Sequence, residues 1–258
     1  MADSQAQSAD EAPTQPVVLI TRVGSWIGAE AAVHFRKRGV TVIGVSSTPK
    51  RSSELACAIA KLSQNPGKFI LCVGALTNPQ IQDQIVEHIL TEGQLAGFVH
   101  NVGAYEHPVT QASEPAGQTA TPIEHWEALQ RSLLEALPLV HRLRTVMRRC
   151  KCRIVHVASE DVLGGLPQNV ALVAIKTAVN ILTAEMAIIE PSITSLAVHP
   201  RVKLPFGSAP ASTLESSLSS VDQLQPAGEL IADLTLSAVH SMSGQFFMYS
   251  EPDFLKTV

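Results

Sequence analysis

The stretch VVLITRVGSWIGAEAAVHFRKRGVTVIGV, residues 17–45, predicts a strand, a turn, a helix and a second strand in succession. Residues 17–20 are apolar and largely β-branched, which favours a strand. The helical pattern of residues 27–38 ends at Gly39, and glycine commonly follows the last turn of a helix. Residues 40–45 are again almost wholly apolar, which is typical of a strand covered on both faces of its sheet.

The same alternation of apolar strands and helices continues to the end of the chain. Further helices are expected at residues 53–62, 79–90, 122–147, 170–189 and 225–240, and further strands at residues 68–73, 97–100, 153–157, 195–198 and 244–248. Short connections between such units predict an α/β fold: a doubly wound, mostly parallel Rossmann-type sheet of about seven strands, with helices on both faces. We expect a disordered leader at residues 1–15 and a single domain at residues 16–258.

The composition excludes several classes of partner. Apolar residues make up 45% of the chain and charged residues 16%, with a net charge of −4, so neither nucleic acid nor an anionic membrane is expected to bind. The basic residues between Arg142 and Arg153 are expected at a solvated helix end rather than in a binding patch. The four cysteines lack the spacing of a zinc site, so no metal is expected. Without a signal peptide or a long apolar run, the protein is expected to be cytoplasmic.

Several short motifs resemble those of the short-chain dehydrogenase/reductase family, in order and in spacing. Residues 21–28, TRVGSWIG, resemble the TGxxxGIG phosphate loop, and residues 100–103, HNVG, resemble the NNAG that closes the fourth strand. Ser159 lies seventeen residues before Lys176, which is the spacing of the family's Ser…YxxxK motif. The segment HPR, residues 199–201, stands where the family has proline and glycine after the sixth strand. The resemblance implies a dinucleotide-binding oxidoreductase.

The phosphate loop departs from the family pattern at two glycines. Arg22 stands at the first glycine and Trp26 at the second, whereas Gly28 keeps its place and Gly24 is additional. Arg22 could bind a phosphate, or the two large side chains could leave the loop unable to hold a dinucleotide, since glycine lets the backbone approach the pyrophosphate. Both interpretations remain open. The resemblance assigns the cofactor to Thr21, Arg22, Gly24, Trp26, Ile27, Gly28, Ser46, Ser47, Asn101, Gly103 and Lys176.

The segment after the second strand bears on the choice of dinucleotide. NAD-dependent members of the family carry an acid there, whereas this chain has SSTPKR at residues 46–51. Small hydroxyls followed by two cations suit a 2′-phosphate, so the resemblance predicts NADP(H) rather than NAD(H). A plain solvated loop is the alternative. Ala75 stands where the family has an aspartate that contacts adenine.

The catalytic positions have changed as well. Ser159 and Lys176 are present, but Leu172 stands at the position of the catalytic tyrosine and Leu133 at that of the asparagine. Leucine cannot transfer a proton, so the family's usual acid/base step is not available from that position. The residues expected to line the substrate cleft are Tyr105, Glu160, Pro200 and Arg201. His156 is expected to be a strand histidine with its hydrogen bonds satisfied, rather than a base.

Two functions remain open. One is an atypical oxidoreductase of specialised metabolism that reduces an activated hydrophobic small molecule, such as an iminium or an enone, or that catalyses a cyclisation or isomerisation by positioning alone. The other is a catalytically inactive pseudoenzyme, acting as a dinucleotide sensor or as the partner of an active homologue. The apolar residues around the helix expected at 170–189 predict a homodimer or homotetramer.

Overall fold

The computed structural model describes residues 15–47, 66–102, 127, 130–131, 133–157, 170–200 and 226–249. For residues 26, 170–176, 200, 226 and 248–249 the description covers the backbone alone. The helix predicted at residues 53–62 and all but the last residue of the leader predicted at residues 1–15 lie outside these ranges. No helix in the described ranges is long and apolar enough to span a membrane.

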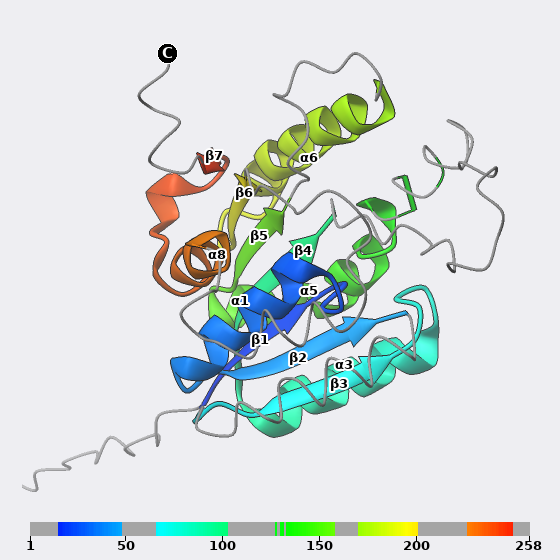
Figure 1. Ribbon diagram of the computed structural model, residues 1–258, viewed down its shortest axis with the longest axis vertical. Coiled ribbons are helices and arrows are strands. Elements are labelled where there is room, and N and C mark those ends of the chain that lie inside the picture. Colours follow the sequence, from blue (N-terminus) through cyan, green and yellow to red (C-terminus); the bar gives the residue numbers. More distant parts are fainter. Residues whose placement is uncertain are drawn as a thin grey trace, which may run out of the picture.

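One parallel sheet forms the centre of the molecule, with its strands in the order β3-β2-β1-β4-β5-β6-β7 (Figure 1). The strands are β1 Pro16–Ile20, β2 Thr41–Ser46, β3 Phe69–Val73, β4 Gln94–Asn101, β5 Arg153–Val157, β6 Thr194–Pro200 and β7 Phe246–Tyr249. The helices are α1 Trp26–Lys37, α3 Pro79–Glu92, α5 Leu137–Cys150, α6 Val170–Ile189, α8 Pro226–Ser237 and the short 3-10 helix η2 His240–Met242. The predicted doubly wound α/β fold is confirmed.

The strands are mostly apolar because both faces of the sheet are covered. Val18 and Ile20 of β1 pack in one core with residues of α1 and α8. Val17 and Leu19 point to the opposite face, into a second core that contains residues of α3, α5 and α6. Consecutive residues of a strand point to opposite faces, so a strand between two cores is apolar on both of its faces.

The strand order reverses direction at β1, between β2 and β4. From β1 the chain proceeds to β2 and β3 on one side, and β4 pairs with the other side of β1. In open α/β sheets of this kind, ligands bind beyond the carboxyl ends of the strands at this point of reversal. The β1–α1 turn and the end of β4 meet there.

The long helix predicted at residues 122–147 is interrupted. Among the described residues of this stretch, 127, 130–131 and 133–134 are helical, residues 135–136 form a turn, and α5 begins at Leu137. Pro138 lies in the first turn of α5, where its missing N–H has no intrahelical partner to lose. The interruption brings Glu135 into a turn rather than onto a helix surface.

The basic run around the end of α5 lies at a helix end that is exposed to solvent, and three of its arginines are also paired with acids. Arg144 and Arg148 both bind the carboxylate of Glu190, which follows α6, and its side chain is only 6% exposed. Arg142 of α5 binds Asp83 of α3. These contacts join α5 to its two neighbours on the same face of the sheet.

Candidate functional site

The turn between β1 and α1 is anchored to strands on both sides. The Thr21 amide donates to the Val99 carbonyl of β4 at 3.0 Å, and the Val23 amide donates to the Val45 carbonyl of β2 at 3.0 Å. Both bonds continue the backbone ladders of the sheet beyond the end of β1. The turn is therefore held in place across the point where the strand order reverses.

A side-chain cap fixes the first turn of α1. Ser25 is the N-cap, and its Oγ accepts a hydrogen bond from the Gly28 amide at 3.1 Å. The amides of Trp26 and Ile27 precede the first intrahelical hydrogen bond, so they present the positive end of the helix dipole to a ligand. A Cβ at Gly28 would lie 2.8 Å from the Arg22 carbonyl oxygen, so the tight turn requires glycine there.

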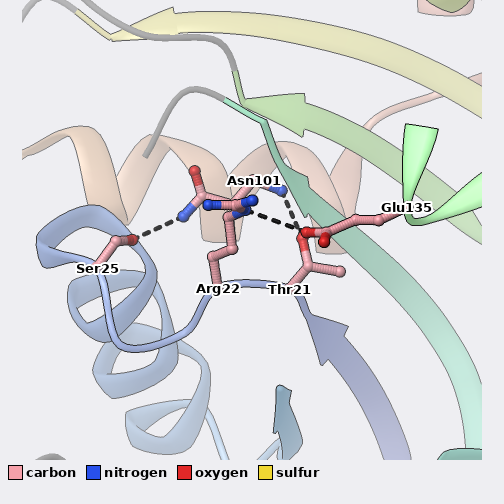
Figure 2. A network of polar contacts seen from close by, with 5 residues as sticks. All are labelled: Thr21, Arg22, Ser25, Asn101 and Glu135. Atoms are coloured by element: carbon pink, nitrogen blue, oxygen red, sulfur yellow. Dashed lines mark hydrogen bonds and ion pairs between the residues drawn. The ribbon is translucent and has the colours of Figure 1, made fainter. Parts of the chain in front are cut away.

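Asn101 at the end of β4 connects this cap to the sheet (Figure 2). Its backbone amide donates to Thr21 Oγ1 at 2.9 Å, and its side-chain Nδ2 donates to Ser25 Oγ at 2.8 Å. The residue is only 1% exposed, and its Oδ1 has no hydrogen-bond partner within the described structure. Because a buried acceptor without a partner is costly, this oxygen is suited to accept a hydrogen bond from a ligand.

Arg22 lies in the same turn, with a left-handed backbone and an ionic partner. Its φ is 49°, a conformation that L-residues other than glycine seldom adopt. This geometry explains why glycine suits the position. Arg22 Nε lies 3.2 Å from Glu135 Oε1, and the two side chains are 22% and 15% exposed. Figure 2 shows Arg22 reaching from the turn to Glu135 alongside the end of β4.

Two buried histidines lie side by side near the end of the strands that carry the site. His100 of β4 and His156 of β5 are neighbours in the sheet, and their Nδ1 atoms are 3.0 Å apart, so one Nδ1 donates a hydrogen bond and the other accepts it. Burial, and secondarily the charge on His100, lower the pKa of His156 well below its usual value. His156 is a strand residue, as predicted, but its Nε2 is buried without a partner, so it is not a fully satisfied one.

The other predicted site residues lie partly within and partly outside the described ranges. Gly24 and Ile27 lie in the β1–α1 turn and the start of α1, and Leu133 is buried at 9% exposure. Ser46 belongs to β2, which extends one residue further than predicted because Ser46 pairs with Val73 of β3.

Ser46 is buried, so of the two predicted serines only Ser47 is exposed. Leu172 and Lys176 belong to α6 and Pro200 to β6, with only their backbones described. The predicted residues outside the described ranges are Gly103, Tyr105, Ser159, Glu160 and Arg201. In the described part of the chain, no three histidine, cysteine or acidic side chains come together as a metal site would require.

Two contributors were not predicted from the sequence. Ser25 carries a recognisable signal, because a serine just before a helical pattern favours an N-cap. Glu135 carries none, since its partner Arg22 is 113 residues away in the chain. A local pattern cannot report such a contact.

These features define a class: a doubly wound α/β protein with a serine-capped helix N-terminus at the reversal of its strand order. Residues 16–200, well over half of the chain, match the family described as short chain dehydrogenase. The chain therefore belongs to the short-chain dehydrogenase family. A comparison with curated proteins found no match.

Solved structures with the same fold are numerous. L-sorbose reductase from Gluconobacter frateurii, in complex with NADPH and L-sorbose, is 19% identical, with a TM-score of 0.67 over 93% of this chain and 97% of that one. The 3-ketoacyl-(acyl-carrier-protein) reductase from Brucella melitensis, in complex with NADH, is 21% identical, with a TM-score of 0.65 over 90% and 96%. A cytoplasmic Saccharomyces cerevisiae protein of unknown function is 21% identical, with a TM-score of 0.63 over 93% and 98%. At these identities the likeness concerns the fold.

Proposed function

We propose that this chain binds NADP(H) and reduces an activated, hydrophobic small molecule without the tyrosine that the family uses. The observation that carries the proposal is the site at the reversal of the strand order. There the capped N-terminus of α1 lies beside the buried, unpartnered Oδ1 of Asn101. A ligand with both phosphate and hydroxyl groups would match these two features together.

The residues present fit a dinucleotide in part. The amides that precede Gly28 would bind the pyrophosphate at the helix N-terminus, and Asn101 Oδ1 would accept a hydrogen bond from a hydroxyl of the ligand. Gly28 allows the tight turn that presents these amides, since a Cβ there would lie 2.8 Å from the Arg22 carbonyl oxygen. Arg22 opposes this fit where it is bound to Glu135, and favours it where its guanidinium is free to bind a phosphate.

The choice of NADP(H) over NAD(H) rests on the sequence after β2. Ser47 is exposed directly after the strand, and Lys50 and Arg51 follow it in the chain. Hydroxyl and cationic groups suit a 2′-phosphate, which NAD(H) lacks. The two fold neighbours differ on this point, since one is complexed with NADPH and the other with NADH.

The chemistry must not depend on a proton from the tyrosine position. By the family's spacing Leu172 stands there and Leu133 replaces the asparagine, and Leu133 is buried on the helical stretch before α5. When bound, NADPH supplies a hydride. An iminium accepts it without a proton, because the acceptor already carries the positive charge. Ser159 and Lys176 would orient the acceptor and the ribose; a cyclisation or isomerisation by positioning is the non-redox form of this proposal.

The pseudoenzyme remains the second candidate, and the Arg22–Glu135 ion pair favours it. The pair lies at the edge of the site, where it would have to rearrange for a phosphate to reach Arg22. If Arg22 and Glu135 stay bound to each other, the protein would act as a dinucleotide sensor or as a partner of an active homologue.

We further propose that the protein is cytoplasmic and forms a homodimer or homotetramer. The large apolar side chains of Ile181, Ile188 and Ile189 on α6 are exposed. A second copy of the chain would remove this apolar surface from water. Light scattering at micromolar concentration tests this, and a monomer would contradict it.

Titration of the purified protein with NADPH and with NADH, followed by nicotinamide fluorescence and calorimetry, tests the proposal. We expect NADPH to bind more tightly than NADH. The double variant Lys50→Gln/Arg51→Gln should lose most of this preference, whereas Lys151→Gln, an exposed lysine at the C-cap of α5, should keep it. Cyclic iminium and enone acceptors are then screened for NADPH consumption, followed at about 340 nm, where reduced nicotinamide absorbs. NADPH binding without any consumption would favour the pseudoenzyme, and no binding of either dinucleotide would refute the proposed NADP(H)-dependent reduction.

A further inference from the structure

Arg22 is held in one position by its backbone and by its partner. Its carbonyl oxygen accepts from the Ser25 amide at 3.0 Å, within a turn that is itself bonded to β2 and β4. Its φ of 49° belongs to the left-handed region. The backbone of Arg22 is thus fixed by the turn, and the ion pair with Glu135 holds its guanidinium.

Glu135 engages only part of that guanidinium. The contact runs from Nε to Oε1 at 3.2 Å, and within the described structure the two terminal nitrogens of Arg22 have no hydrogen-bond partner. An arginine carries five N–H donors in a planar fork, which suits two acceptors at once. The guanidinium of Arg22 can therefore donate to phosphate oxygens, whereas the neighbouring Glu135 carboxylate repels them.

The buried Oδ1 of Asn101 is an independent sign of a ligand at this place. It is 1% exposed and without a partner, and it belongs to the same network as Ser25 and Thr21 (Figure 2). The ion pair and this acceptor come from different elements and meet at the carboxyl ends of β1 and β4. Together they indicate that the ion pair lies within a ligand site and is not merely a surface contact.

We propose that Glu135 is an intramolecular competitor for Arg22, which sets the affinity of the site for a diphosphate group. This inference rests on the proposed dinucleotide site and assigns its regulation to one ion pair. A diphosphate binds by taking over the guanidinium of Arg22, and Glu135 must release it. Arg22 is thus the phosphate-binding residue of a turn whose family glycine has been replaced, and Glu135 determines how readily it is available.

In the wild type a diphosphate must first displace Glu135 from Arg22, and loss of this competition should strengthen binding. Breaking one partly exposed ion pair of this kind corresponds to a factor of about two to five in affinity. The Glu135→Gln variant should therefore bind inorganic pyrophosphate and NADPH about two- to fivefold more tightly than the wild type, with a smaller gain at high salt. Arg22→Gln should weaken both by a similar factor.

The double variant separates competition for Arg22 from general repulsion. If Glu135 acts by holding Arg22, the gain from Glu135→Gln largely disappears in the Arg22→Gln background, whereas a general field effect would persist there. Glu87→Gln, which removes one exposed carboxylate from α3, is the matched control and should bind as the wild type does. Thermal unfolding of each variant confirms that it is folded before titration.

Isothermal titration of these five proteins with inorganic pyrophosphate, and separately with NADPH, gives outcomes that do not overlap. Tighter pyrophosphate binding by Glu135→Gln that depends on Arg22 supports the inference, even if NADPH binds to none of the variants and the proposed function fails. If Glu135→Gln binds NADPH as tightly as the wild type does, and also binds pyrophosphate as tightly as the wild type does, the inference is overturned and the proposed function is left intact. Absence of pyrophosphate binding in every variant also overturns it, as does weaker binding by Glu135→Gln, which would make Glu135 a positioning residue.

Discussion

Mild acid should destabilise this fold through the two histidines buried between β4 and β5. His100 and His156 share a hydrogen bond between their Nδ1 atoms, and both are almost completely buried. Desolvation by burial, and then the charge on His100, lower the pKa of His156 well below its usual value. In the folded protein His156 is therefore neutral under mildly acidic conditions, whereas in the unfolded chain water surrounds it and its pKa returns to about 6.5.

The sign and size of the effect follow from proton linkage. Because the folded pKa is lowered, the contribution to stability is complete above about pH 6.5 and is lost progressively as the pH falls toward the folded pKa. Each proton taken up on unfolding contributes a slope that approaches about 1.4 kcal/mol per pH unit. Between about pH 7.5 and about pH 5.5, His156 alone should lower the free energy of unfolding by about 1.4 kcal/mol.

Urea denaturation of the wild type, His156→Asn and His141→Asn over this pH range measures the effect. His141 is exposed on α5, so its removal changes the number of histidines without touching the buried pair. His156→Asn should be less stable near neutral pH, but its free energy of unfolding should fall by about 1.4 kcal/mol less than that of the wild type as the solution is acidified. If His156→Asn and His141→Asn both keep the wild-type slope, the reasoning about the buried pair is wrong.

Two further substitutions test the packing of the fold and the shape of the site. Glu190→Gln should lower the free energy of unfolding by about 2 kcal/mol in urea denaturation, because the buried carboxylate binds Arg144 and Arg148. Desolvation raises the pKa of Glu190, but hydrogen bonds from Arg148 and Arg144 outweigh it and the pKa is lowered. The wild-type advantage should therefore persist above about pH 4.5 and shrink below it, and an advantage constant down to about pH 3 would contradict this. Gly28→Ala should lower Tm by several degrees, roughly 4 °C for about 1 kcal/mol, and weaken NADPH binding, because the new Cβ would lie 2.8 Å from the Arg22 carbonyl oxygen. An unchanged Tm with unchanged binding would show that the turn can relax.

The fold could be predicted from the sequence because its main determinant is local. Most strand positions are apolar on both faces, and that pattern indicates a sheet covered on both faces, as the two cores confirm. The helix that starts after the first turn could likewise be predicted, and Ser25 could have been recognised as its cap.

The site was predictable only where motif spacing or the fold itself determined it. The motifs placed Thr21, Gly28 and Asn101 at one edge of the sheet, and the structure brings these three residues together there. The interruption of the predicted helix before Leu137 was missed, although Pro138 is a signal for a helix start. That interruption puts Glu135 in a turn.

Contacts between distant segments could not be predicted. The pairing of Arg22 with Glu135 and of His100 with His156 depends on which strands and helices become neighbours, and on the direction in which each side chain then points. Residue types and periodicity contain neither piece of information. The left-handed backbone of Arg22 could not be predicted either. An arginine at a family glycine position shows that the residue has changed, but not whether the backbone conformation has.

A crystal structure of the protein with NADPH, at a concentration well above its measured Kd, tests the central claim most directly. We predict density for the pyrophosphate at the N-terminus of α1, a hydrogen bond from the ligand to Asn101 Oδ1, and Arg22 bound to phosphate and separated from Glu135. An intact Arg22–Glu135 pair with no dinucleotide at this edge of the sheet would contradict the account.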